Sequence, residues 1–254
     1  MCSFANRLVN AATDYSLWPR LKPARAYIPT YNIGGSECMM ITRDDAKCWV
    51  VYCHGNSVTL SDLHLSGIPD QLVEACTCNF VAPSYPTRRL SGEAHDRAVV
   101  ETVQKVYDRL REDITCPIYV VGRSVGVGVA LGACQGRKPA GIALISGFAS
   151  VKALAPWTIR WALPNRLDNI AAVRELKDVP MLIMHGDTDE IVPTNNSRQL
   201  AEQVPNCTLH IIKGMTHIPG ANDLACICAG VQKLISGAGL SNTSMPHYQL
   251  WHAR

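Results

Sequence analysis

The chain has 254 residues, of which 47% are hydrophobic and 18% are charged, and its formal net charge is +3. This composition is that of an ordinary globular protein and argues against a disordered chain. The small charge, without a concentrated basic stripe, argues against a dedicated nucleic-acid-binding protein. No apolar run reaches the roughly 18 residues of a membrane-spanning helix, and the N-terminal residues show no secretory signal.

Short apolar runs rich in β-branched residues alternate with helical patterns, which predicts an α/β domain with a mainly parallel sheet and helices on both faces. The expected strands are 26–29 and 37–41 (a hairpin around Gly34-Gly35), 47–55, 78–83, 117–122, 140–146, 178–186 and 208–214. The expected helices are 61–76 with Ser61 as N-cap, 92–113, 124–134, 195–204 and about 220–236.

The remaining segments set the domain limits. Residues 147–170 contain two Trp and two Pro and are expected to be irregular or partly helical. The tail 237–254 shows no pattern. We therefore expect an N-terminal segment 1–25, one domain over 26–236 and a C-terminal tail.

The eleven cysteines predict a reduced, intracellular, cytoplasmic protein. Four of them lie in apolar runs, where a thiol behaves as a small buried hydrophobic group: Cys48, Cys53, Cys116 and Cys134. The C-x-C pairs at 76–78 and 226–228 lack the spacing of a zinc site, so no metal and no cofactor are expected.

Cys2 differs because it lies at a terminus, near the dispersed basic residues Arg7, Arg20, Lys22 and Arg25. Such a cysteine is a candidate for acylation, which predicts peripheral membrane association. An ordinary terminal cysteine is the alternative.

The sequence VVGRSVG joins a predicted strand to a predicted helix and contains the pattern G-x-S-x-G around Ser124. The tight turn needs small residues two positions either side of the serine, here Gly122 and Gly126, and it exposes the hydroxyl above the sheet. The helix that follows directs its N-terminal amides towards developing negative charge. A glycine-rich turn that only packs helix against sheet is the alternative. The pattern predicts that Ser124 is a nucleophile.

A serine nucleophile needs a base that a third group orients. In this topology the order is serine, acid, histidine. MHGDTDEIVP places Asp187 and Asp189 after one strand, and KGMTHIP places His217 after the next. We expect Asp189 as acid and His217 as base. Asp187, which could cap the loop backbone, is the alternative acid, and His185 is expected to brace the acid loop.

The run YCHGNSV predicts the turn that presents a backbone N–H to an oxyanion. Asn56 and Ser57 are equal candidates for this first donor. The N–H of Val125, which follows the nucleophile, is the second. A plain turn that ends a strand is the alternative.

These segments together resemble the α/β-hydrolase family. VYCHGNSVTL, VVGRSVGVGVALG, VPMLIMHGDTDEIVP and IIKGMTHIPG occur in the family's order, between about Ala26 and Ile235. The resemblance implies the α/β-hydrolase fold with a short cap at 147–177, and it carries nucleophile, acid and base to Ser124, Asp189 and His217. The most similar branch is the small α/β-hydrolase-domain proteins that include acyl-protein thioesterases, which remove palmitate from membrane-associated proteins.

Two features depart from that branch. Its members often carry an N-terminal cluster of lipidated cysteines, whereas this chain has only Cys2. A segment that usually reads DYxGYGxSxG is here PSYPTRRLSG, with Ser84 at the Asp position and Tyr85 and Arg88 expected at a pocket mouth. Palmitoyl-protein specificity therefore stays open.

The sequence thus predicts a metal-independent serine hydrolase that cleaves esters or thioesters through an acyl-enzyme, with palmitoyl-protein thioesterase as the finer hypothesis. Its expected partners are an acyl ester or thioester, including a lipidated protein, and no nucleic acid. A serine peptidase of the same fold is one alternative, although the chain leaves no room for a large gating domain. A catalytically inactive binding module is another, although such a module has no need of a complete triad.

Overall fold

The protein, seen in a computed structural model, is described over residues 28–86, 92–155, 157–237 and 248–251. The nine strands of these described residues form one sheet in the order β1-β2-β4-β3-β5-β6-β7-β8-β9. Neighbours from β4 through β8 pair in parallel, whereas β1, β2 and β9 pair antiparallel. The strands are β1 Tyr31–Ile33, β2 Ser36–Ile41, β3 Cys48–Cys53, β4 Cys78–Pro83, β5 Ile118–Arg123, β6 Gly141–Ile145, β7 Met181–Gly186, β8 Cys207–Ile212 and β9 Tyr248–Trp251.

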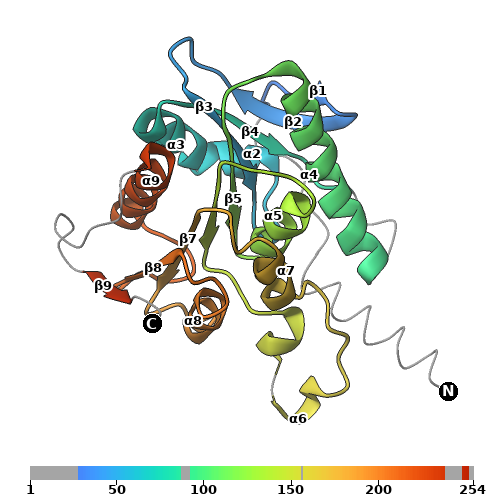
Figure 1. Ribbon diagram of the computed structural model, residues 1–254, viewed down its shortest axis with the longest axis vertical. Coiled ribbons are helices and arrows are strands. Elements are labelled where there is room, and N and C mark those ends of the chain that lie inside the picture. Colours follow the sequence, from blue (N-terminus) through green and yellow to red (C-terminus); the bar gives the residue numbers. More distant parts are fainter. Residues whose placement is uncertain (1–27, 87–91, 156, 238–247, 252–254) are drawn as a thin grey trace.

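Helices cover both faces of the sheet, as expected (Figure 1). They are α2 Leu60–Leu65, α3 Ile68–Cys76, α4 Glu93–Asp113, α5 Gly126–Cys134, η1 Val151–Leu154, α6 Trp157–Arg160, α7 Asn169–Glu175, α8 Asn195–Ala201 and α9 Ala221–Ser236. Successive strand residues face opposite sides, so Val50 packs with Leu72 of α3 while Val51 packs in the cluster of Val99 from α4. In the described parts of the chain, no helix combines the length and apolarity that crossing a bilayer requires.

Two predicted elements are placed differently. The first strand of the hairpin is Tyr31–Ile33, which directly adjoins the turn. Of the expected 26–29, residues 26 and 27 lie outside the described residues, and 28 and 29 are in no strand. The predicted helix 61–76 is two helices, separated at Gly67, which has φ +69°. Its N-cap is Thr59 rather than Ser61, since Thr59 Oγ1 accepts from Asp62 N–H at 3.0 Å and Asp62 Oδ2 accepts from Thr59 N–H at 3.1 Å.

The C-terminal tail, for which the sequence indicates no element, contributes β9 to the sheet edge beside β8. A strand of four residues is too short for its pattern to be recognised in the sequence. The sheet therefore extends beyond the expected domain limit at residue 236.

The segment after β6 projects from the domain, and hydrogen bonds join its two ends to each other. At its base, Asn169 N–H donates to the Ala149 carbonyl at 2.9 Å, and Asn169 Nδ2 donates to the Phe148 carbonyl at 2.8 Å. The buried Arg166 guanidinium binds both carboxylate oxygens of Asp96 on α4, at 2.7 and 2.8 Å. We call residues 150–168, which project between Ala149 and Asn169 and include Arg166, the cap segment (Figure 1).

All the described cysteines are free thiols. Cys48, Cys53 and Cys134 are buried as expected, while Cys116 is half-buried. Burial raises the pKa of the Cys134 thiol to about 12, so this group is un-ionised at neutral pH. Cys2 lies outside the described residues.

Candidate active site

The turn after β5 has the strained geometry that its sequence predicts. Ser124 adopts φ +55°, a conformation that a side chain rarely takes without support from its surroundings. A Cβ on Gly122 would lie 2.6 Å from the Gly126 carbonyl oxygen, and a Cβ on Gly126 would clash with the Cys53 carbonyl. Both glycines are therefore required by close backbone approach, and α5 begins immediately beyond the serine.

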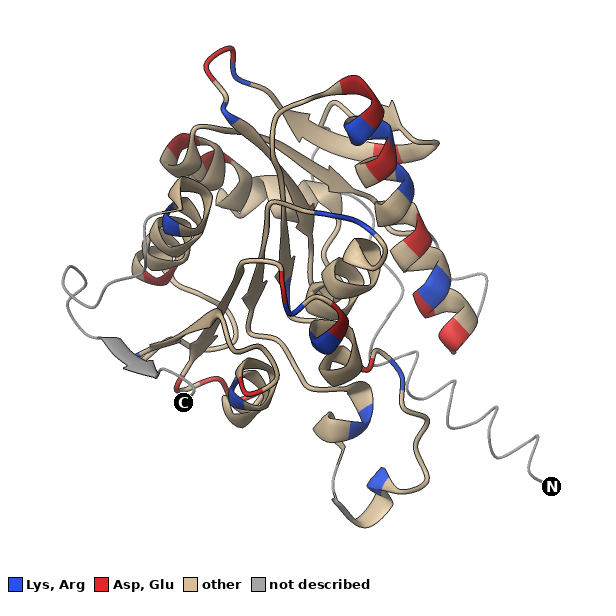
Figure 2. Cartoon of the chain, viewed as in Figure 1, with Lys and Arg blue, Asp and Glu red and all other residues tan. Residues whose placement is uncertain are grey.

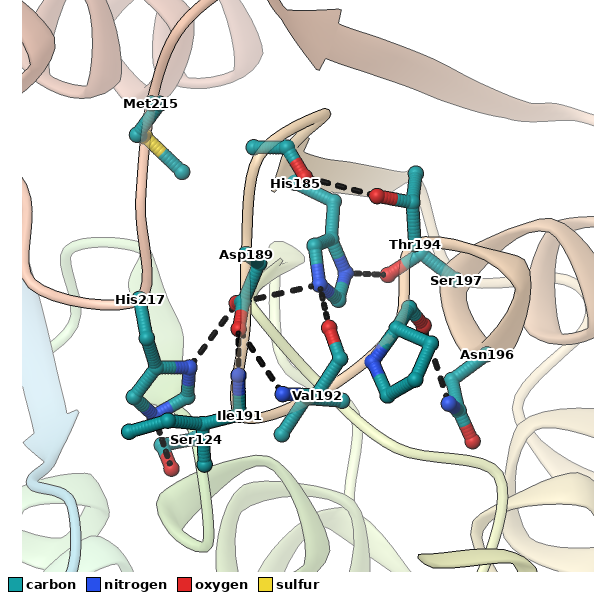
Figure 3. A network of polar contacts seen from close by, with 12 residues as sticks. Ser124, His185, Asp189, Ile191, Val192, Thr194, Asn196, Ser197, Met215 and His217 are labelled. Atoms are coloured by element: carbon teal, nitrogen blue, oxygen red, sulfur yellow. Dashed lines mark hydrogen bonds and ion pairs between the residues drawn. The ribbon is translucent and has the colours of Figure 1, made fainter.

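The three residues expected to form a triad are brought into one chain of contacts (Figure 3). Ser124 Oγ lies 3.0 Å from His217 Nε2, and His217 Nδ1 lies 2.8 Å from Asp189 Oδ2. The serine follows β5, the aspartate follows β7 and the histidine follows β8. Because these strands are parallel, their following loops meet at one edge of the sheet.

Hydrogen bonds stabilise the ionised form of the Asp189 carboxylate, although its side chain is fully buried. Its Oδ1 accepts backbone N–H groups from Val192 at 2.8 Å and Ile191 at 3.0 Å. Burial acts to raise the pKa of Asp189, but the hydrogen bonds from Val192 and His217 outweigh it and hold the pKa below its ordinary value. The carboxylate therefore accepts a hydrogen from His217 Nδ1, which leaves Nε2 free to receive a proton from the serine.

His185, at the end of β7, is a second histidine against the same carboxylate. Its Nε2 lies 2.8 Å from the Val192 carbonyl and 3.2 Å from Asp189 Oδ2, and its Nδ1 lies 2.6 Å from Ser197 Oγ. Burial lowers the pKa of His185, so the ring is neutral at neutral pH. Since Nε2 faces only acceptors, it carries the hydrogen, and Ser197 donates to Nδ1. His185 thus contacts the acid directly as well as the loop around it.

Further contacts join the three loops to one another. Asp187, the alternative acid, accepts from Gly214 N–H at 2.6 Å and so ties the acid loop to the base loop. The Arg123 guanidinium donates to the His217 carbonyl at 2.6 Å. Sequence reasoning missed Arg123, whose only signal is its place between Gly and Ser in the G-x-S-x-G pattern.

The HGN turn after β3 lies against the serine. A Cβ on Gly55 would lie 3.5 Å from Ser124 Cβ. The buried His54 ring stacks on Tyr85 with ring centroids 3.9 Å apart, and the Tyr85 hydroxyl donates to the His54 carbonyl at 3.1 Å. Tyr85 is therefore buried beneath the turn rather than at a pocket mouth, which corrects the sequence expectation. Arg88 lies outside the described residues.

The expected oxyanion donors lie around this turn. Val125 occupies the N-cap position of α5, and no residue within the described ranges accepts a hydrogen bond from its N–H. Asn56 is half-buried, and the exposed Ser57 adopts φ +58° with its hydroxyl 3.3 Å from Asn56 Oδ1. All three stay predictions for the oxyanion site. Over the described part of the chain, no three His, Cys, Asp or Glu side chains are grouped as metal ligands.

Comparisons with known proteins agree with this architecture. A family model described as serine aminopeptidase, S33, matches residues 165–219, a segment that includes Asp189 and His217 but not Ser124. The comparison with curated proteins gave no relative.

Several solved structures are similar over most of the chain. TT1662 from Thermus thermophilus has a TM-score of 0.65 and 16% identity, over 83% of this chain and 99% of that chain. A hormone-sensitive lipase from a metagenome library has a TM-score of 0.62 and 17% identity, over 92% and 91%. Est1E from Butyrivibrio proteoclasticus has a TM-score of 0.59 and 18% identity, over 83% and 98%. These likenesses confirm that the chain has the α/β-hydrolase fold.

Proposed function

We propose that this chain of the α/β-hydrolase fold is a serine hydrolase that cleaves carboxylic esters or thioesters through an acyl-enzyme. The observation that carries the proposal is the contact chain from Ser124 Oγ through His217 to the buried Asp189, with distances of 3.0 and 2.8 Å. A hydroxyl is a poor nucleophile unless a base accepts its proton, and this arrangement supplies that base.

The reaction follows from the positions of these groups. Ser124 Oγ bonds to the acyl carbon while His217 Nε2 takes the hydroxyl proton, and the resulting imidazolium is stabilised by Asp189. His217 then protonates the departing alcohol or thiol as the tetrahedral intermediate collapses to the acyl-enzyme. Water, deprotonated by His217, releases the acid and restores the serine.

Charge on the carbonyl oxygen needs donors that are already in place. We assign them to the backbone N–H of Val125 and to that of Asn56 or Ser57, next to the serine. Removing one such donor typically costs about 3 kcal/mol of transition-state stabilisation. The N-terminal end of α5 adds a positive dipole at the same position.

The finer part of the proposal concerns the substrate. One of the similar structures is named as a hormone-sensitive lipase, which supports ester substrates. The resemblance to acyl-protein thioesterases extends the candidates to palmitoylated proteins. The expected cytoplasmic location, with attachment through acylated Cys2, belongs to this hypothesis, and Cys2→Ser should then move the protein from membranes to cytosol.

The decisive test is labelling of the purified protein with a fluorophosphonate probe, beside the Ser124→Ala variant. Labelling that is lost in the variant is the expected result, together with a fall in turnover of roughly 10⁶-fold. Turnover on acyl esters and thioesters of increasing chain length then measures the substrate preference. Full activity in a folded Ser124→Ala protein would refute the nucleophile assignment.

A second candidate is a serine peptidase, and the match of residues 165–219 to the serine aminopeptidase family favours it. Dipeptide amides and aminoacyl amides, assayed beside the acyl esters, separate the two candidates. Cleavage of amides in preference to esters would establish the peptidase. Ligand binding without labelling or turnover would instead support an inactive binding module.

A further inference from the structure

Large apolar side chains are exposed on the cap segment. Trp161 is 80% exposed, and Ile159 and Leu154 are also exposed. The Trp161 indole N–H donates to the Thr158 carbonyl at 3.0 Å, so its polar atom is already satisfied and its ring offers an apolar surface. Single exposed apolar residues are ordinary, but a group of them marks an interaction site.

These residues lie on η1, on α6 and directly after it, and the two short helices are joined. The Arg160 guanidinium Nη2 donates to the carbonyls of Ala153 and Ala155, at 3.0 Å each, which holds α6 against the end of η1. We call the surface formed by Lys152, Leu154, Ile159, Arg160 and Trp161 the cap face.

The cap face is basic as well as apolar. No Asp or Glu occurs from Gly147 to Leu167, while Lys152, Arg160 and Arg166 do. Arg166 is buried against Asp96 and does not contribute to the surface. In Figure 2 the colouring along η1 and α6 is accordingly blue without red. The cap face therefore carries cationic side chains beside its apolar ones.

The cap face lies at the same edge of the sheet as the proposed triad. It follows β6, while the exposed Ile191 and Ile218 lie in the loops after β7 and β8, next to the acid and the base. Ile218 is 73% exposed beside His217. Because β6, β7 and β8 are neighbouring parallel strands, their loops gather at one edge.

We propose that the cap face docks on an anionic lipid bilayer. Tryptophan concentrates at membrane–water interfaces, exposed isoleucine and leucine gain by entering the acyl boundary, and Lys and Arg are attracted to anionic headgroups. The absence of acidic residues from Gly147 to Leu167 removes repulsion of this stretch by that surface. Docking would turn the open edge of the site towards acyl groups at the membrane. This orientation rests on the proposed function, whereas the docking itself does not require Ser124.

The test is co-sedimentation of the full chain with phosphatidylcholine vesicles, with and without phosphatidylserine. The chain carries Cys2→Ser so that acylation contributes nothing. We expect binding to the anionic vesicles that weakens with added salt. Ile159→Ser with Trp161→Ser should lower the partition coefficient about ten-fold, from lost apolar burial. Lys152→Gln should lower it about five-fold, which corresponds to roughly 1 kcal/mol per basic residue at an anionic surface.

Tyr31→Ser is the matched control, because Tyr31 is 45% exposed on the edge strand β1, which β2, β4, β3 and β5 separate from β6 and the cap that follows it. It should leave binding unchanged. Ser124→Ala should also bind normally, which separates this proposal from the catalytic one. Failure to bind anionic vesicles, or binding that the cap-face variants do not weaken, would overturn the proposal. Self-association in light scattering that the same variants abolish, without vesicle binding, would assign the face to a second copy of the chain.

Discussion

Lowering the pH from 6.5 towards 4 should destabilise the folded protein, because His54 is held neutral in it. Burial lowers the pKa of His54 from 6.5 to about 4, against the opposing effect of a hydrogen bond to the Gly55 carbonyl. In the unfolded chain the same ring binds a proton near pH 6.5. The unfolded state therefore gains a proton between pH 6.5 and 4 that the folded state does not. The free energy of unfolding decreases as the pH is lowered through this range.

The expected loss of stability follows from the lowered pKa of His54. A difference of 2.5 pKa units, at about 1.36 kcal/mol each, corresponds to about 3 kcal/mol lost between pH 6.5 and 4. The full stabilisation is present above pH 6.5. Burial also lowers the pKa values of His185 and His210, which adds to the loss with the same sign. Asp189 has a lowered pKa, so its stabilisation is lost only below about pH 4, outside this window.

The assay is urea denaturation at a series of pH values for the parent protein and for His54→Asn. The variant is less stable overall, but its free energy of unfolding should fall less steeply between pH 6.5 and 4. His64→Asn, on the exposed surface of α2, controls for the removal of a histidine. An equal slope in the parent protein and His54→Asn would refute the reasoning.

Substitutions at three positions, Gly126, Asp189 and His185, probe the site. Gly126→Ala forces a Cβ against the Cys53 carbonyl and should cost about 3 kcal/mol or more in thermal unfolding. Gly220→Ala should cost little, because its Cβ would make only an ordinary contact of 3.5 Å with Asp223 Oδ2. Asp189→Asn should lower kcat roughly 10⁴-fold without a change in the circular dichroism spectrum, and normal turnover would exclude it as the acid. His185→Leu leaves the Ser197 hydroxyl and Val192 carbonyl without their partner, at about 1–3 kcal/mol each in chemical denaturation. His185→Gln, which retains a donor, should recover part of the lost stability and kcat.

The sequence predicted the parallel sheet, its helices on both faces and most element positions, because apolar runs of strand length alternate with helical periodicity. It also predicted a close-packed turn at Ser124, since the requirement for glycine at 122 and 126 is local. The pairing of Asp189 with His217 rested on chain order and topology alone. Those arguments identify which loops meet, and the structure places Asp189 rather than Asp187 against His217.

Contacts between segments distant in the sequence could not be predicted. Tyr85 stacks on His54 across 31 residues of chain, which no local pattern indicates. Arg123 reaches the His217 carbonyl across 94 residues, although its neighbour Ser124 is the most recognisable residue in the sequence. The break at Gly67 was missed because a helix with glycine at one position is still periodic on either side of it.

Hydrogen bonds between the two ends of the cap segment allow its length and sequence to vary among chains of this fold. Because Asn169 and Ala149 are joined independently of what lies between them, the entropy of closing the loop depends only weakly on its length, by about 0.6 kcal/mol for each doubling. The contacts that align Ser124, Asp189 and His217 lie outside residues 150–168. The projecting part of the segment before Arg166 is therefore a natural position for grafting, where chain of another length or chemistry can be exchanged while the contacts among Ser124, Asp189 and His217 are retained.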